Sequence, residues 1–219
     1  PYFIQALLNL GNCYRIIRSN IKAINCYKVG LNLKPKNIEL LYNLGIVFGE
    51  EGELEKATDL LYKVISYSPR KAIAHAYLGA ILQEKGSLKQ ASIHLNKALE
   101  LDPNLSIAYF HLSSQETFKN ANLKEALFSI NLSREKSSLN KINILFARSY
   151  LLNRERHFLD SSKCLKAANA ICREVYPSDF QFHINKSRDL LKEYKYAKGN
   201  LKLPRSQCDQ IFIVGMPRS

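Results

Sequence analysis

The strongest constraint in this sequence is a pattern that recurs every 34 residues. Three successive segments share a Leu-Gly pair, an alanine, a large apolar residue and a proline. The members are Leu10-Gly11, Leu44-Gly45 and Leu78-Gly79; Ala23, Ala57 and Ala91; Tyr27, Leu61 and Leu95; and Pro35, Pro69 and Pro103. This period is typical of arrays in which each unit is a pair of helices that cannot bury its apolar stripe alone. The sequence therefore predicts an all-α fold of stacked helix pairs.

The residue types at the recurring positions explain how such pairs pack. Glycine in the first helix and alanine in the second allow the two backbones to approach closely. Each proline follows the second helix, where a residue without an N–H stops helix propagation. Gly52 and Gly86 are expected in the turns between the two helices of their units.

The period and the order of these residues resemble tetratricopeptide repeats. The resemblance implies a right-handed α-solenoid. Five units are expected, the fourth with one extra residue in its turn near Lys119–Asn122 and the fifth degenerate: 1–37, 38–71, 72–105, 106–141 and 142–175. Degeneration toward one end is typical of a terminal, capping repeat.

A further helix is expected to cap the array within 176–198. Ser178 and Gln181 match a capping box, and the apolar residues that follow fall on one face of a helix at about 179–196. Residues 199–209 have the composition of a linker.

The first helices of such an array line its concave side, where tetratricopeptide proteins dock extended peptides. An asparagine side chain supplies both a donor and an acceptor for a peptide backbone, and Asn9 and Asn43 occupy equivalent positions. A clamp for a C-terminal carboxylate is not predicted, because Ile73 and Tyr77 stand where it would need cations. The alternative is that the polar side chains face solvent in an unused groove. The candidate peptide contacts are Asn9, Asn12, Asn43, Tyr77, Gln83 and His111.

Composition excludes several other classes of function. The net charge is +13, with +4 in residues 1–105 and +9 in residues 106–219, but the charges are dispersed, as on a solvated basic surface. The aromatic residues fall at helical spacing, which favours core packing over base stacking, so no nucleic-acid partner is expected. The five histidines have no metal-ligand spacing, and no metal is expected.

The cellular location is inferred from the cysteines and from hydropathy. Five scattered cysteines fit a reducing compartment better than a disulfide scaffold. No apolar run approaches the ~20 residues that span a bilayer. We therefore expect a cytoplasmic protein without a membrane span.

Residues 211–219, IFIVGMPRS, break the helical pattern. Four consecutive β-branched or aromatic residues before a glycine predict the buried first strand of a parallel sheet. The Gly/Pro loop that follows carries Arg218 and Ser219 and is suited to bind a phosphate through backbone N–H groups. A Walker-type phosphate loop that begins at Gly215 and a non-catalytic strand are the alternatives.

The segment V-G-M-P-R-S resembles the opening of the 5′-phosphosulfate loop of sulfotransferases. The repeat and linker before it are similar to those of bacterial tetratricopeptide–sulfotransferase fusions, which resemble protein-tyrosine sulfotransferases. This resemblance implies that residues 210–219 are the first strand and partial loop of an α/β domain. That domain would transfer a sulfuryl group from 3′-phosphoadenosine-5′-phosphosulfate (PAPS) to a hydroxyl, such as that of tyrosine.

The resemblance also implies roles for the loop residues. Gly215, Pro217, Arg218 and Ser219 would hold the phosphosulfate, and Arg218 would stabilise the charge that develops in the transition state. We expect the chain to be the N-terminal part of such an enzyme, cut within the loop, so that these 219 residues alone bind no cofactor and have no activity. The alternative function is a non-catalytic peptide-binding adaptor or scaffold.

Overall fold

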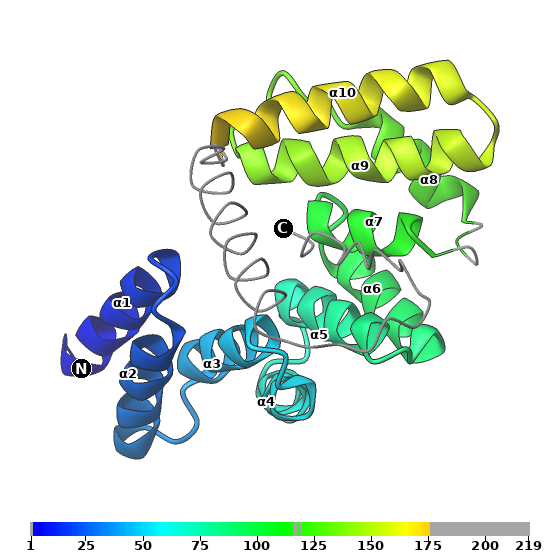
Figure 1. Ribbon diagram of the computed structural model, residues 1–219. Coiled ribbons are helices and arrows are strands. Elements are labelled where there is room, and N and C mark those ends of the chain that lie inside the picture. Colours follow the sequence, from blue (N-terminus) through cyan, green and yellow to red (C-terminus); the bar gives the residue numbers. More distant parts are fainter. Residues whose placement is uncertain (1, 116–117, 119, 176–219) are drawn as a thin grey trace, which may run out of the picture. The chain divides into compact units, whose positions relative to one another are not determined.

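The computed structural model describes residues 2–115, 118 and 120–175, and within these residues it contains helices and no strand (Figure 1). The predicted capping helix, linker and C-terminal strand, 176–219, lie outside the described residues. No helix among the described residues is long and apolar enough to cross a membrane. The described part of the chain contains ten helices: α1 (Tyr2–Ile16), α2 (Asn20–Leu33), α3 (Ile38–Glu50), α4 (Leu54–Tyr67), α5 (Ala72–Glu84), α6 (Leu88–Leu101), α7 (Ser106–Ser113), α8 (Ala121–Ser129), α9 (Ser138–Arg154) and α10 (Phe158–Val175).

The first six helices form three pairs, α1/α2, α3/α4 and α5/α6, and each second helix also packs on the first helix of the next unit. The second helices end just before the recurring prolines. Lys34, Ser68 and Asp102 each precede a proline and have φ values of −142°, −142° and −143°. The proline ring disfavours the α conformation of the residue before it, which explains where these helices end.

The hydrophobic core lies where neighbouring units meet. In one cluster, Ala23 and Tyr27 of α2 pack with Leu40, Leu44 and Val47 of α3. A second cluster repeats the arrangement one unit later, between α4 and α5. Helices α2 and α4 therefore cover the first helix of the unit that follows each of them.

The predicted close approach of paired helices is confirmed at Gly79. A Cβ atom on Gly79 would lie 2.5 Å from Cγ of Leu95 and 3.1 Å from the carbonyl oxygen of Ala91. Both atoms belong to α6, which packs against α5 at this point. Any side chain at this position would force the two helices apart.

The turns inside the pairs contain one residue in the left-handed region. Gly52 and Gly86 have φ values of 78° and 80°, as expected for turn glycines. Arg18 and Arg156 take this conformation in the first and last pairs, with φ values of 59° and 63°. A non-glycine residue in this region costs roughly 1–2 kcal/mol, so these two turns carry strain that the glycine turns avoid.

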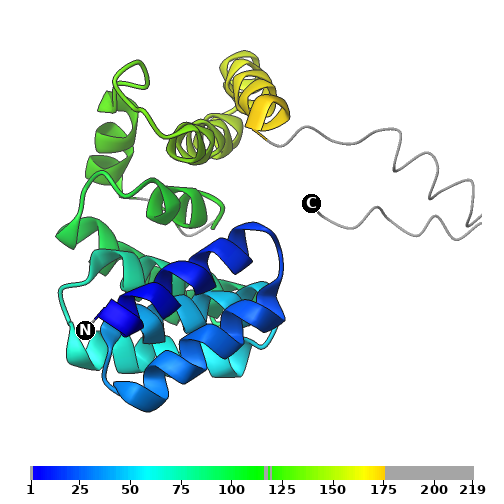
Figure 2. The same cartoon turned by 90° about the vertical axis from the view of Figure 1, so that its left-hand side faces the viewer.

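Helices α9 and α10 pack side by side as the last pair (Figures 1 and 2). This pair carries serines in place of the glycine and alanine of the earlier pairs. Ser149 and Ser161 are both buried. The Ser161 hydroxyl donates a hydrogen bond to the carbonyl oxygen of Ser149 at 3.0 Å, and the two hydroxyl oxygens are 3.2 Å apart. Mutual hydrogen bonding removes the cost of burying two hydroxyl groups.

The fourth unit is irregular, because its first helix is short. Helix α7 has 8 residues, ends at Ser113 and packs mainly against α9. Arg154 at the end of α9 donates to the carbonyl oxygens of Ser113 and Gln115, each at 2.8 Å, and of Phe118 at 3.2 Å. This guanidinium satisfies carbonyl groups that would otherwise be unpaired beyond the end of α7.

A second arginine of α9 holds the end of α8. Arg148 donates to the carbonyl oxygens of Leu127 at 2.9 Å, Phe128 at 3.2 Å and Ile130 at 2.6 Å. Helix α9 begins at Ser138, inside the segment 106–141 assigned to the fourth unit, because the hydroxyl of Ser137 accepts a hydrogen bond from the N–H of Asn140. The two arginines thus attach the irregular fourth unit to the last helix pair.

Candidate functional site

The first helices of three successive units, α3, α5 and α7, line a pocket of about 250 Å³. Its apolar walls are mainly isoleucine side chains, with one alanine and Leu61 of α4, and they are joined by a phenol, an imidazole and two carboxylates. The principal lining residues are Ile46, Ala80, Ile81, Ile107, Tyr77, His111, Glu50 and Glu84. A concave, mostly apolar pocket with a few polar groups is the usual form of a ligand site.

Tyr77 is one of two tyrosines that pack together on this side of the helices. Its ring lies edge-on to Tyr42 of α3, with 5.7 Å between the ring centroids and an interplanar angle of 84°. Burial raises the pKa of both tyrosines, so both phenols are neutral. A neutral phenol can both donate and accept a hydrogen bond.

Aromatic side chains continue from the pocket toward α9. The centroid of the Phe110 ring lies 5.0 Å from His111, 6.2 Å from Phe146 and 6.0 Å from Tyr150. Together with Tyr42 and Tyr77, these residues form what we call the aromatic row, which runs over α3, α5, α7 and α9.

His111 connects the pocket to the aromatic row. Burial lowers its pKa to about 4, because the charged imidazolium loses solvation in this apolar place. At neutral pH the ring is therefore uncharged and presents one donor and one acceptor nitrogen.

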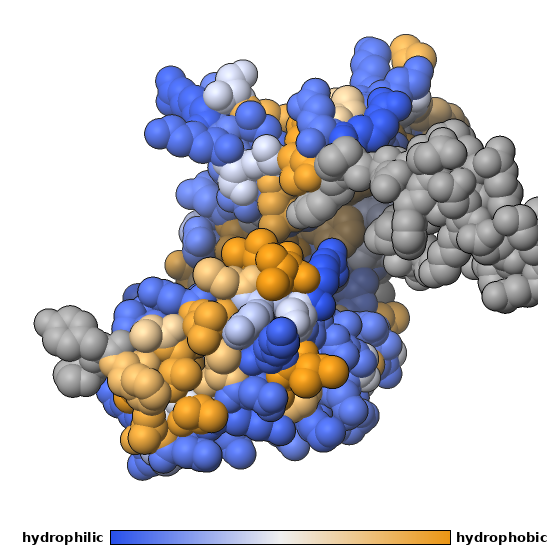
Figure 3. Space-filling model, turned by 60° about the vertical axis from the view of Figure 1, so that its left-hand side comes forward, coloured by the Kyte–Doolittle hydropathy of each residue, from blue (hydrophilic) through white to orange (hydrophobic). Residues whose placement is uncertain are grey.

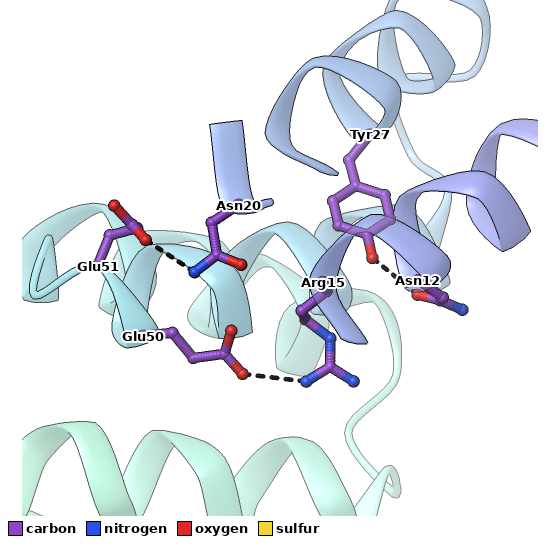
Figure 4. Close-up of polar contacts among 6 residues, drawn as sticks. All are labelled: Asn12, Arg15, Asn20, Tyr27, Glu50 and Glu51. Carbon is purple, nitrogen blue, oxygen red and sulfur yellow. Dashed lines mark hydrogen bonds and ion pairs between the residues drawn. The ribbon is translucent and has the colours of Figure 1, made fainter. Parts of the chain in front are cut away.

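The predicted asparagine contacts make hydrogen bonds within their own units. Asn9 accepts from Nε2 of Gln5 at 3.0 Å, and Nδ2 of Asn43 donates to the carbonyl oxygen of Glu39 at 2.8 Å. Asn12 accepts from the hydroxyl of Tyr27 at 2.7 Å, a contact between α1 and α2 (Figure 4). Each side chain keeps some hydrogen-bonding capacity, since an amide has several sites.

Gln83 belongs to a polar network between the third and fourth units. Its Nε2 donates to the hydroxyl of Ser114 at 2.9 Å, and its Oε1 accepts from Nε2 of the buried Gln115 at 3.3 Å. Among the six predicted contacts, the structure brings Tyr77 and His111 together in the pocket, and the four amide side chains lie outside its lining. The predicted loop residues Gly215, Pro217, Arg218 and Ser219 lie outside the described residues.

The sequence pattern did not predict the charged residues at the end of the pocket. Nη1 of Arg15 in α1 donates to Oε1 of Glu50 in α3 at 3.0 Å, and Nδ2 of Asn20 donates to Oε1 of Glu51 at 2.7 Å (Figure 4). These contacts join the first unit to the second beside the pocket. The 34-residue period could have pointed to these charged residues, because Glu50 and Glu84 occupy equivalent positions in successive units.

Two histidines outside the pocket form a packed pair that the sequence did not predict. Nε2 of His75 donates to the carbonyl oxygen of Pro69 at 3.0 Å, so its Nδ1 accepts from Nδ1 of His94 at 3.1 Å. Burial and the neighbouring His75 lower the pKa of His94. The pair belongs to the packing between α5 and α6.

Parts of this chain are similar to known proteins. Residues 74–105, which cover α5 from Ala74 onward and all of α6, match the family model described as a tetratricopeptide repeat. A stretch of 73 residues, 33% of the chain, is 36% identical to the anaphase-promoting complex subunit CDC16 of Saccharomyces cerevisiae and spans 9% of that protein.

Solved tetratricopeptide domains have a similar fold. The first such domain of Spaghetti (RPAP3), bound to the HSP90 peptide SRMEEVD, has a TM-score of 0.50 and 23% identity, over 58% of this chain and 95% of that one. The Arabidopsis OM64 domain has a TM-score of 0.50 and 18% identity, over 57% of this chain and 96% of that one. At these identities the likeness establishes the helical repeat fold.

The depressed pKa of His111 predicts a pH-dependent stability. The unfolded chain binds a proton at His111 near pH 6.5, whereas the folded chain does so near pH 4, so stability falls as the pH drops through this window. We expect the free energy of unfolding to fall by up to about 3 kcal/mol between pH 7 and pH 4 because of proton binding at His111. Urea unfolding of the chain and of His111→Gln at several pH values measures it.

The matched control is His157→Gln, which removes an exposed histidine between α9 and α10. The His111 variant should lose less stability on acidification than the parent, and the control should behave like the parent. Equal pH dependence in the parent and in His111→Gln would show that this ring is not responsible.

Proposed function

We propose that the repeats bind an extended polypeptide along the aromatic row, with one apolar side chain of the ligand in the pocket between α3, α5 and α7. The observation that carries this proposal is the pocket, whose lining brings Tyr77 and His111 together with isoleucine side chains. Burial of apolar ligand surface would supply binding energy, and the two neutral polar rings would orient the ligand by hydrogen bonds.

The charged side chains near the aromatic row help to define which kind of ligand it binds. The Spaghetti domain binds a peptide with three acidic residues among its last four. In this chain Arg15 is paired with Glu50, Lys71 is paired with Glu39, and Ile73 and Tyr77 add no charge. We therefore propose a ligand recognised through apolar and aromatic side chains, not through a terminal carboxylate.

Peptide ligands are first identified by probing a peptide array with the chain. The variant Tyr77→Ala then tests whether these peptides bind along the aromatic row. Because truncating an aromatic anchor at an interface costs about 2 kcal/mol or more, the variant should bind roughly 30-fold more weakly. The control is Tyr67→Ala in α4, a half-exposed tyrosine outside the pocket. Calorimetric titration measures both. Unchanged affinity in Tyr77→Ala, or equal losses in the two variants, would contradict groove binding.

We also propose that the protein uses this groove to present a polypeptide hydroxyl, such as that of tyrosine, for sulfuryl transfer from PAPS. The support is the sequence V-G-M-P-R-S at 214–219 and its resemblance to a phosphosulfate loop. In the reaction the hydroxyl oxygen bonds to sulfur, the bond from sulfur to the 5′-phosphate oxygen breaks, and the hydroxyl proton passes to a base. Arg218 would stabilise the departing phosphate, and Gly215, Pro217 and Ser219 would shape the loop.

Sulfuryl transfer is tested with protein expressed from its complete reading frame, labelled PAPS and the array-selected peptides. Transfer should depend on Arg218, and Arg218→Ala should reduce the rate by 100-fold or more, as loss of one preorganised charge-stabilising group does, on the order of 10²–10³. Peptide affinity should be unchanged. Binding without transfer in the unaltered protein would reject the enzyme and leave the adaptor function.

A further inference from the structure

Helix α1 and the turn after it expose a continuous apolar stripe. Its members are spaced three or four residues apart, which places them on one face of a helix. Phe3, Leu10 and Ile17 are 63%, 45% and 69% exposed, and Ala6 and Cys13 between them are also exposed. Figure 3 shows apolar side chains gathered over the helices at this end of the chain. We call these five residues the α1 face.

The same register positions are buried in the units that follow. Leu10 corresponds to Leu44, Leu78 and Leu112, which are 4%, 0% and 2% exposed. Ala6 and Cys13 correspond to positions that are likewise buried in the next three units: Leu40, Ala74 and Ala108, and Val47, Ile81 and Gln115. The α1 face is therefore the surface that, in the next three units, lies against the second helix of the preceding unit.

The structure shows which helix covers these positions. In the third unit, Val64 of α4 packs on Ala74. Ala57 and Leu61 of α4 pack in one cluster with Leu78 and Ile81. The α1 face offers nearly the same side chains, with Ala6, Leu10 and Cys13 in place of Ala74, Leu78 and Ile81. A helix that fits α5 therefore also fits α1.

The two ends of the stripe are apolar, whereas the equivalent residues of the third unit are charged. Phe3 and Ile17 stand at the positions of Lys71 and Lys85, which flank the covered surface of α5. With these two residues the apolar stripe of α1 runs over about four helical turns, or roughly 21 Å. That length matches the 14 residues of α4. Ile21 at the start of α2, 75% exposed, adds apolar surface where the next units carry Glu55 and Lys89.

We propose that the α1 face is the docking surface for the second helix of one further repeat unit, which packs on Ala6, Leu10 and Cys13 as α4 packs on α5. The proposal rests on continuity with the established interface, because α2 packs on α3 and α4 packs on α5 through residues at equivalent positions of the repeat. A second copy of the chain is a poorer fit, since Ala57, Leu61 and Val64 of its own α4 are fully buried.

The test adds a unit of known structure to the whole chain. A copy of residues 35–68, which contains α3 and α4, is joined to Pro1, because Pro1 occupies the same register position as Pro69. The copied segment contains no cysteine, so Cys13 reports directly on the covered face. Alkylation of individual cysteines is followed by mass spectrometry. A covered thiol reacts only when the interface opens, so Cys13 should react on the order of 100-fold more slowly, while Cys172 keeps its rate.

The matched control is Leu10→Asp. In the chain without the added unit it should move the melting midpoint by less than about 2 °C, because Leu10 is half exposed. In the extended chain it should abolish the protection of Cys13, because it would bury an unpaired carboxylate. Cys13 reacting as fast in the extended chain as in the parent would overturn the proposal. So would protection of Cys13 in the parent that grows with protein concentration, which would assign the face to a second copy.

Discussion

The second, third and fourth units of this protein depend on the burial of a first helix beneath the second helix of the unit before it. The contact is built from apolar and aromatic side chains, such as Val64 on Ala74 and Tyr27 with Leu44. Because each unit contacts mainly its neighbours, stability is transmitted along the array as a chain of similar interfaces. The first helices are thereby held side by side, and their remaining faces form a common surface.

The candidate site is a consequence of that alignment. Tyr77 and His111 come from different units and meet because α5 and α7 are in contact. The Arg15–Glu50 ion pair lies at the same junctions as the apolar contacts and joins the first two units. The irregular fourth unit stays attached through Arg148 and Arg154, so the aromatic row can continue from Phe110 to α9.

The features that could be predicted from the sequence are those that repeat. The helix pairs, the helix ends at prolines and the close approach at Gly79 follow from residue types at a fixed period. The register also identified Tyr77 and His111. It could not show that the amide of Asn43 would bond to Glu39 of its own helix, because that choice depends on competing local acceptors.

The departures from the period could not be read from the sequence. Arg148 and Arg154 donate to carbonyl groups 18 to 41 residues earlier in the chain, and no local pattern reports such contacts. The same holds for the His75–His94 pair, which depends on the rotation of two helices against each other.

The most direct measurement compares one substitution at equivalent positions of the pattern. Leu78→Ala removes a fully buried side chain that packs in one cluster with α4, and Leu10→Ala removes its counterpart on the open α1 face. Urea unfolding should show a loss of about 2–5 kcal/mol for Leu78→Ala and of less than about 1 kcal/mol for Leu10→Ala. Equal losses at the two positions would contradict the claim that the preceding helix is what stabilises each unit.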